Sequence, residues 1–207
     1  MSRLTIIAVL LAAAPAGAQG LEGTGRISLV AGWRYTPNDH FARSAQEAGF
    51  PLARASAGGP QGTGTFAYAA SDALEVAIDL FAGYEALDLT NADDLSSVSY
   101  GALLGVRAYW VLGPLRPNIG LGLGPALIYT QGGPAGHLVE RLVTAYAATA
   151  GFTWRLSNTL GLHVDVRYLL ARGMAEDIGG VNAGGLWGGV GVTWYFAGEP
   201  SRPGAVR

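Results

Sequence analysis

His163 and Asp165 are the residues of this sequence best placed for acid–base chemistry. They stand two positions apart, so on an extended strand both side chains would project to one face, where the carboxylate could orient the imidazole. Hydrolysis also needs a nucleophile within reach of its base, and no serine stands beside them. We therefore predict that the protein is not an enzyme and has no catalytic residues. A membrane-embedded lipid hydrolase stays as an alternative that a serine or an activated water beside His163 would support.

Other reactive groups are scarce. The chain has no cysteine and no lysine among its 207 residues, which excludes disulfides, thiolate sites and lysine chemistry. His40 and His137 lie in predicted loops, each too isolated to build a metal site. The glycines at positions 120, 122 and 124 repeat every second residue, which does not match a nucleotide-binding loop. We predict no metal and no cofactor.

A larger group of ionisable residues shares one face of the predicted strands. The two-residue alternation places five arginines, four carboxylates and one histidine on this face, namely Arg26, Arg34, Arg107, Arg155, Arg167, Glu75, Asp79, Glu85, Asp165 and His163. A single unpaired charge in a low-dielectric interior costs several kcal/mol. We predict that these residues form a structural salt-bridge network; scattered charges hydrated by interior waters are the alternative.

The elements that carry these residues are strands with a period of two. Eight segments alternate between large apolar and small or polar residues, near 26–35, 66–68, 74–84, 100–112, 119–123, 146–154, 160–170 and 190–196. Short links around positions 71–72, 113–116 and 157–158 alternate strictly with long ones at 37–61, 90–97, 131–138 and 173–184. Tight turns at one end and long loops at the other are typical of membrane barrels. The sequence predicts an all-β fold, an eight-stranded antiparallel up-and-down transmembrane β-barrel.

Each predicted strand has one apolar face and one face of small or polar residues. The composition of the small, polar face decides which of the two faces is in contact with water. A soluble lipocalin-like carrier would show the same alternation with its apolar face inward. Its outer face would then need charged side chains at about a quarter or more of positions, yet here glycine, alanine and serine dominate and only 14% of the chain is charged. We expect the apolar face outside and the small, polar face inside a narrow barrel.

Aromatic residues gather at both ends of the strands. We expect two interfacial belts, where rings with a polar atom are favoured. The loop-side belt comprises Trp33, Tyr35, Tyr84, Tyr100, Tyr129 and Tyr168, and the turn-side belt comprises Tyr68, Trp110, Trp154, Trp194 and Phe196.

The first eighteen residues have the pattern of a signal peptide. Arg3 precedes an apolar run over 4–14, and small residues at 16–18 form the cleavage pattern. We predict a signal peptide over 1–18 and a single barrel domain over 19–207, with strands within about 25–196 and a short tail over 197–207.

From Arg26 to Phe196 the sequence resembles the small eight-stranded outer-membrane barrels: the OmpA membrane domain and OmpX-like and OmpW-like proteins. Gly191, Trp194 and Phe196 resemble the spacing by which insertion machinery recognises such barrels. In that family the closing aromatic is usually the last residue, whereas here Ala197 to Arg207 follow it. The resemblance implies an outer-membrane location, with the lipid bilayer, lipopolysaccharide and the barrel insertion machinery as partners.

The expected function is structural or interactive. We expect a monomer with a largely plugged polar interior and no nucleic-acid partner, since the net charge is −2. The sequence contains no motif that identifies a surface ligand. The loop at 37–61 is the remaining segment that could recognise one. An OmpW-like narrow channel or transporter for small or hydrophobic molecules is the alternative.

Overall fold

The computed structural model describes residues 22–36, 58–88, 90, 94–132, 138–175 and 179–197. The predicted signal peptide, most of the 37–61 loop, His40, His137 and the tail after position 197 lie outside these residues. In the described ranges, no helix has the length and apolar character needed to cross a bilayer.

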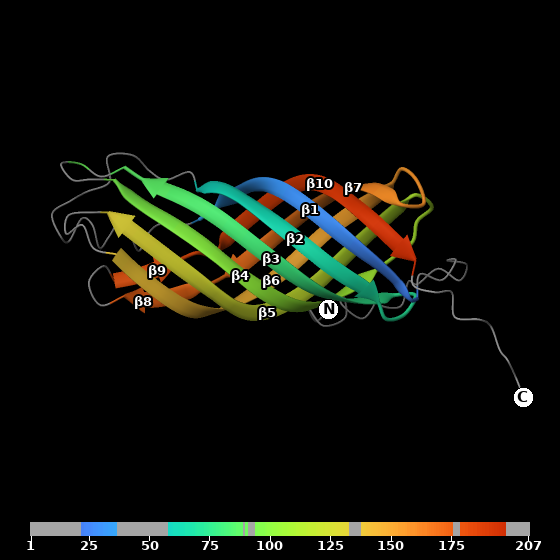
Figure 1. Ribbon diagram of the computed structural model, residues 1–207, viewed down its shortest axis with the longest axis horizontal. Coiled ribbons are helices and arrows are strands. Elements are labelled where there is room, and N and C mark those ends of the chain that lie inside the picture. Colours follow the sequence, from blue (N-terminus) through green and yellow to red (C-terminus); the bar gives the residue numbers. More distant parts are fainter. Residues whose placement is uncertain are drawn as a thin grey trace, which may run out of the picture.

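Eight antiparallel strands close into a barrel in the order β1-β10-β7-β6-β5-β4-β3-β2 (Figure 1). The barrel strands are β1 (Thr24–Tyr35), β2 (Gly59–Ala69), β3 (Leu74–Leu87), β4 (Leu95–Tyr109), β5 (Leu115–Gly132), β6 (Leu138–Arg155), β7 (Leu160–Leu170) and β10 (Gly185–Ala197). Two short strands, β8 (Arg172–Ala175) and β9 (Gly179–Asn182), pair with each other between β7 and β10. The predicted eight-stranded antiparallel up-and-down barrel is confirmed.

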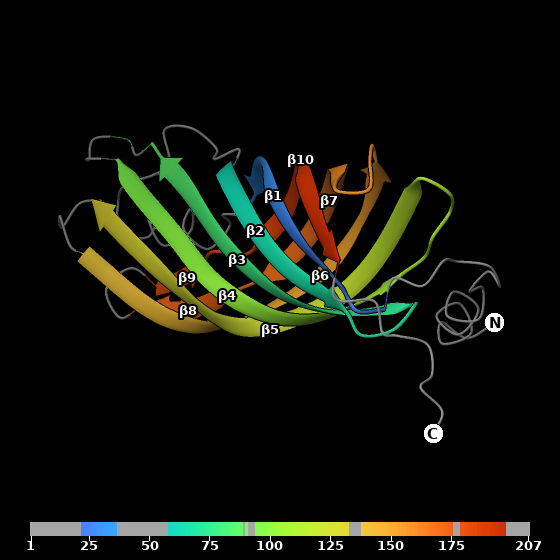
Figure 2. The ribbon, with the colours of Figure 1, turned by 45° about the vertical axis from the view of Figure 1, so that its right-hand side comes forward.

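The strands are strongly tilted, as Figure 2 also shows. A line followed through cross-strand partners starts at Gly25 on β1, crosses all eight strands through Val106 and Ala148, and returns to β1 at Tyr35. This shift of ten residues is the shear of the barrel, and in a barrel of this strand number it goes with a large tilt and a narrow interior. Residues at the same height along the barrel axis, when they lie on different strands, are therefore not cross-strand partners.

Burial alternates along every barrel strand. On β2 the odd-numbered residues from Gly59 to Ala69 are buried, while most of the even-numbered ones are exposed. The interior is only wide enough for side chains to fill it, and small residues make room there. A Cβ at Gly120, for example, would meet Arg107 Cγ at 2.5 Å. Glycines on the inner face thus leave space for long arginine side chains.

Several strand boundaries differ from the predicted ones. The fourth strand ends at Tyr109 and not near position 112, because Gly113 adopts a φ of 63° in the following turn and Leu115 already begins β5. The second and last strands begin earlier than predicted, at Gly59 and Gly185, and the predicted 173–184 loop contains β8 and β9. Small residues in these segments give no clear alternation, and pairing with neighbouring strands decides their conformation.

The wall is uneven at the loop side. The β5–β6 ladder continues to Gln131 opposite Leu138, whereas β7 leaves β6 after Leu170 opposite Tyr146. Beyond that point β8 and β9 continue the β7–β10 hairpin through a hydrogen bond from Ala183 N to Ala171 O of 2.9 Å. In Figure 1 the strands β4, β5 and β6 reach further to the left than β1 and β2.

Candidate functional site

A compact set of charged residues lies across the lumen in the turn-side half of the barrel. We call it the interior charge cluster; it consists of three arginines and three carboxylates, namely Arg26, Arg107, Arg167, Glu75, Asp79 and Asp165. All six occupy inward positions of β1, β3, β4 and β7, and none is more than 7% exposed. Their formal charges balance, which lowers the cost of burying them together.

Glu75 joins β1, β3 and β4 at the turn-side end of the cluster. It receives two hydrogen bonds from Arg26, from Nε at 3.0 Å and from Nη2 at 2.5 Å. This two-bond geometry is the strongest form of an arginine–carboxylate contact. Arg107 adds a longer ion pair, with Nη1 at 3.7 Å from Glu75 Oε1.

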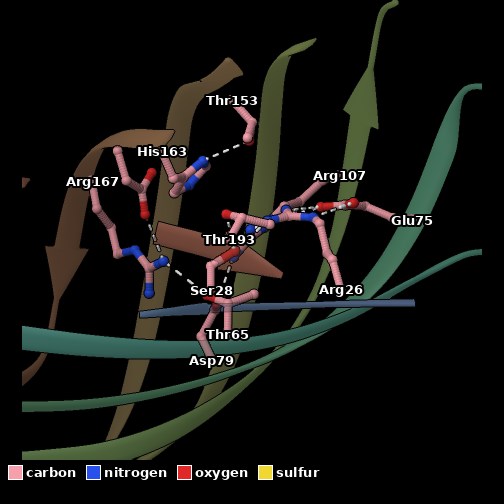
Figure 3. A network of polar contacts seen from close by, with 11 residues as sticks. Arg26, Ser28, Thr65, Glu75, Asp79, Arg107, Thr153, His163, Arg167 and Thr193 are labelled. Carbon is pink, nitrogen blue, oxygen red and sulfur yellow. Dashed lines mark hydrogen bonds and ion pairs between the residues drawn. The ribbon is translucent and has the colours of Figure 1, made fainter. Parts of the chain in front are cut away.

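Asp79 is the centre of the cluster, and Figure 3 shows the side chains that converge on it. Its Oδ1 receives hydrogen bonds from Arg107 Nη2 and from Thr65 Oγ1, each at 2.5 Å. Arg167 Nη2 lies 3.5 Å from the same oxygen and donates to Asp165 Oδ2 at 3.0 Å. Ion pairs and hydrogen bonds therefore run without interruption from β1 to β7 across the lumen.

Hydroxyl groups surround the charged groups. Arg26 Nη1 donates to Ser28 Oγ at 2.8 Å, and Ser28 shares a hydrogen bond of 2.7 Å with Thr193. His163 Nδ1 lies 2.8 Å from Thr153 Oγ1 on the neighbouring strand β6. Ser28 thus extends the cluster to β10, while the His163–Thr153 pair joins β7 to β6 beside it.

The His163–Asp165 pair does not form a catalytic dyad. Asp165 pairs with Arg167 and His163 with Thr153, so the carboxylate does not orient the imidazole. A hydroxyl does lie beside the imidazole, but His163 and Thr153 are each 2% exposed. Nucleophile and base must meet a substrate, and at this exposure neither side chain of the pair is open to one.

Arg34 and Glu85 form a second polar layer nearer the loop side. Arg34 Nη1 donates to Ser99 Oγ and to Ala183 O, both at 2.8 Å, and Nη2 lies 3.6 Å from Glu85 Oε2. Arg34 thereby ties β1 to β4, to β3 and to the segment before β10. Ten buried apolar residues of the loop-side half pack together around this level: Phe81, Leu95, Leu103, Ala126, Ile128, Ala145, Ala147, Leu169, Ala171 and Ala183.

Arg155 takes a different place from the other predicted charges. It lies at the turn-side mouth, half-buried, where it donates to the backbone oxygens of Ser157 and Asn158. Its guanidinium also lies 5.1 Å from the centre of the Tyr195 ring. The ten predicted residues thus divide into the central cluster with His163, the Arg34–Glu85 layer, and Arg155 at the mouth.

Sequence reasoning missed some interior residues. Arg116 was placed in a turn, yet β5 begins at Leu115 and Arg116 is buried opposite Thr153. Trp187 is fully buried, with Arg167 5.7 Å from its ring centre and its Nε1 donating to Gln61 O at 3.3 Å. Arg116 lies four residues, or two strand periods, before the inner-face glycine at 120, and this even spacing is the signal that could have identified Arg116.

The outer face carries the predicted aromatic residues. Trp110 and Tyr129 are half-buried. The other nine are exposed, namely Trp33, Tyr35, Tyr68, Tyr84, Tyr100, Trp154, Tyr168, Trp194 and Phe196. Of the residues proposed as an assembly signal, Gly191 faces Val30 across the β1–β10 ladder and Phe196 stacks on Phe66 with ring centres 5.9 Å apart. Trp194 lies outward between them on β10.

The described residues contain no group of three histidine, aspartate or glutamate side chains arranged to hold a metal ion. The carboxylates of the cluster already accept from arginines, so what the site does chemically is join β1, β3, β4 and β7 through buried ion pairs.

No protein family matches the sequence, and no curated protein matches it either. Solved structures do match. The outer membrane protein OprG from Pseudomonas aeruginosa superposes with a TM-score of 0.58 and 14% identity, over 85% of this chain and 97% of OprG. Ail, the attachment invasion locus protein of Yersinia pestis, gives a TM-score of 0.50 and 15% identity, over 84% of this chain and 99% of Ail. The likeness is one of fold, and by it the protein is a small eight-stranded barrel of the outer-membrane type.

Proposed function

We propose that the protein is an integral outer-membrane barrel whose lumen is closed by ion pairs and whose role is structural or interactive at the cell surface. The observation that carries this proposal is the inverted distribution of side chains: apolar residues outside and a charge-balanced polar cluster inside. A water-soluble protein buries its apolar residues and exposes its charges.

The outer surface has the properties of a lipid-facing wall. Leu121 is 71% exposed, Val190 67% and Leu104 62%, and each is surrounded by other outward apolar residues. Monomeric soluble proteins rarely expose apolar patches larger than a few hundred Å². A barrel has no free edges, so its backbone hydrogen bonds are satisfied inside a bilayer.

The inner contacts support a closed lumen. Arg107 and Asp79 meet at the centre of the interior charge cluster and are linked on both sides to further pairs. Opening an aqueous path would separate charges that are each at most 2% exposed, and that separation costs several kcal/mol. The predicted signal peptide, insertion machinery and lipopolysaccharide contacts fit this proposal and stay part of it.

Two measurements test the proposal. The first compares boiled and unboiled samples of membrane fractions on a gel: a folded barrel migrates differently until it is boiled, and the shifted band should occur in the outer-membrane fraction. A soluble periplasmic protein would overturn the proposal in favour of a lipocalin-like carrier.

The second measurement is single-channel conductance in planar bilayers. The unmodified protein should give no stable open level, whereas Arg107→Ala should give ion-conducting events, because Asp79 and Glu75 lose a shared partner. Arg172→Ala is the matched control, since Arg172 is exposed on β8. A stable ion-selective pore in the unmodified protein would contradict the closed lumen.

A second candidate function, a conduit for small apolar molecules, is favoured by one feature of the wall. Ladder pairing between β4 and β5 skips Ala102 and Leu103, opposite Gly124 and Pro125, and Pro125 has no N–H to donate. An outer hollow at this point is lined by Leu80, Phe81, Tyr100, Gly101, Pro125 and Leu127. Phe81 belongs to the buried apolar residues of the loop-side half, so at this interruption of the ladder the outer hollow lies against interior apolar packing.

A disulfide across this interruption of the ladder tests the conduit. The chain has no cysteine, so Ala102→Cys with Pro125→Cys creates a single reversible lock between residues that would be partners in the interrupted register. Uptake of a small apolar fluorophore by cells carrying the protein should fall on oxidation and recover on reduction. Equal uptake in both states would eliminate the lateral route.

A further inference from the structure

A small cavity lies at the turn-side mouth of the barrel, beside Arg26 and Glu75 of the interior charge cluster. Its volume is about 30 Å³, and its lining includes Arg26, Glu75, Tyr109, Arg116, Asn118 and Tyr195. This volume holds about two water-sized probes. It therefore admits the oxygens of one small group and excludes a sugar ring or a nucleobase.

Arg116 is the residue in this cavity whose hydrogen bonding is incomplete. It is 7% exposed, yet its Nε and Nη1 have no hydrogen-bond partner among the described residues. Buried polar atoms are nearly always satisfied in folded proteins, so the two free N–H groups of Arg116 require a hydrogen-bond acceptor.

The charges at the mouth select the sign of that group. Arg26 is matched by Glu75 through two hydrogen bonds. Arg116 and Arg155 form no ion pair within the described part of the chain, and both guanidinium groups lie 5.1 Å from the centre of the same Tyr195 ring. Two positive charges held near one ring repel each other, and an anion bound beside Arg116 offsets that repulsion.

We propose that the turn-side mouth is a binding site for a single phosphate group, held by Arg116 with Arg155 at its rim. The planar fork of a guanidinium matches two oxygens of a phosphate, and charge-assisted contacts of this kind are the strong ones. The remaining oxygens face the open side of the mouth. The site borders the closed lumen, since Arg26 and Glu75 of the interior charge cluster also line the cavity, but Arg116 and Arg155 take no part in the ion pairs that cross the barrel.

The phosphate group has two possible sources, free inorganic phosphate and the headgroup of a phospholipid at the barrel rim. Equilibrium dialysis with radiolabelled phosphate measures the first, using the folded full chain in a sugar-based detergent that contains no phosphate. Addition of short-chain phosphatidylglycerol, with phosphatidylglycerol binding measured by calorimetry, tests the second. Saturable binding of either probe with a Kd of about 1 mM or below supports the site and identifies its source.

Variants connect the binding to the named residues. Arg116→Gln should weaken binding by about tenfold to a hundredfold, the range expected for losing a charge-assisted contact. Arg155→Gln should weaken it less, because Arg155 also holds backbone oxygens. Arg172→Gln, the same change on exposed β8, should leave binding unchanged.

The unmodified protein alone can overturn the proposal. If neither probe binds saturably to the heat-modifiable, folded form, the mouth holds no phosphate group, whatever the variants do. Equal binding by the unmodified protein and by a folded Arg116→Gln variant would also overturn it. Loss of the gel shift in the unmodified protein would instead count against the barrel itself, so the two proposals fail in distinguishable ways.

Discussion

Asp79 is the residue on which the interior charge cluster depends most. It receives Arg107 Nη2 and Thr65 Oγ1 at 2.5 Å each and lies 3.5 Å from Arg167 Nη2. Asp79→Asn removes the charge with little change in volume and leaves three buried arginines against two carboxylates. Breaking a buried ion pair by removing one partner costs about 3–5 kcal/mol. Both arginines retain another carboxylate: Arg107 Nη1 lies 3.7 Å from Glu75 Oε1, and Arg167 Nη2 lies 3.0 Å from Asp165 Oδ2. We therefore expect a loss of unfolding free energy in the lower part of this range, about 3 kcal/mol.

A double-mutant cycle separates pairing from mere loss of packing. Arg107→Met should cost as much as Asp79→Asn, because it leaves Asp79 with the hydrogen bond from Thr65 and, as its remaining cation among the described residues, the more distant Arg167. The double variant restores the charge balance, with the Arg26–Glu75 and Arg167–Asp165 pairs intact. Its cost should fall short of the summed single costs by about 2 kcal/mol, within the range measured for residues in contact.

The assay is reversible urea unfolding in lipid or detergent, followed by tryptophan fluorescence and by the gel shift. Asp88→Asn is the control, since Asp88 is exposed just beyond β3, and such a change alters stability by about 0.5 kcal/mol or less. The reasoning is refuted if Asp79→Asn behaves like this control, or if the single costs add without coupling.

Two further predictions concern the wall and the inner packing. Leu121 and Leu142 are equally exposed, at 71% and 72%, but Leu121 lies in the middle of the outer apolar band while Leu142 lies beyond the last β6–β7 pair. Leu121→Arg should therefore cost about 2–4 kcal/mol of unfolding free energy in bilayers and Leu142→Arg about 1 kcal/mol or less; equal costs would contradict the proposed depth of the barrel. Trp187→Ala should cost about 3–5 kcal/mol because it empties a fully buried site. Trp187→Phe should cost clearly less in the same unfolding experiment, and identical costs would show that the ring does not pack as described.

Much of the fold could be predicted from local sequence. Alternation along 74–84 and 160–170 identifies the inward residues of β3 and β7, because successive side chains of a strand point to opposite faces. The strict exchange of short and long links identifies an up-and-down barrel. Where inner and outer residues are both small, as from Gly59 to Gly64, the pattern weakens and β2 began earlier than predicted.

The partners within the site were not predictable in the same way. Arg34 and Arg26 lie on one strand with the same parity, yet Arg26 belongs to the central cluster and Arg34 to a separate layer with Ser99 and Glu85. The place of a residue in the two-residue alternation predicts that its side chain points inward. It does not predict at which height along the barrel axis that side chain meets other side chains. Arg155 shows the same limit, since its inward position at a strand end leaves it at the mouth.

Local patterns are enough to predict the strands, their two faces and the inward charges, because these follow from a two-residue backbone period and from the residues at each turn. Only the closed barrel decided that Asp79 meets Arg107 and Arg167, and that Arg116 and Arg155 share one aromatic ring at the mouth. The physical reason is the shear of ten residues, which is set by hydrogen bonding around all eight strands together. It brings to one level residues that no local pattern relates.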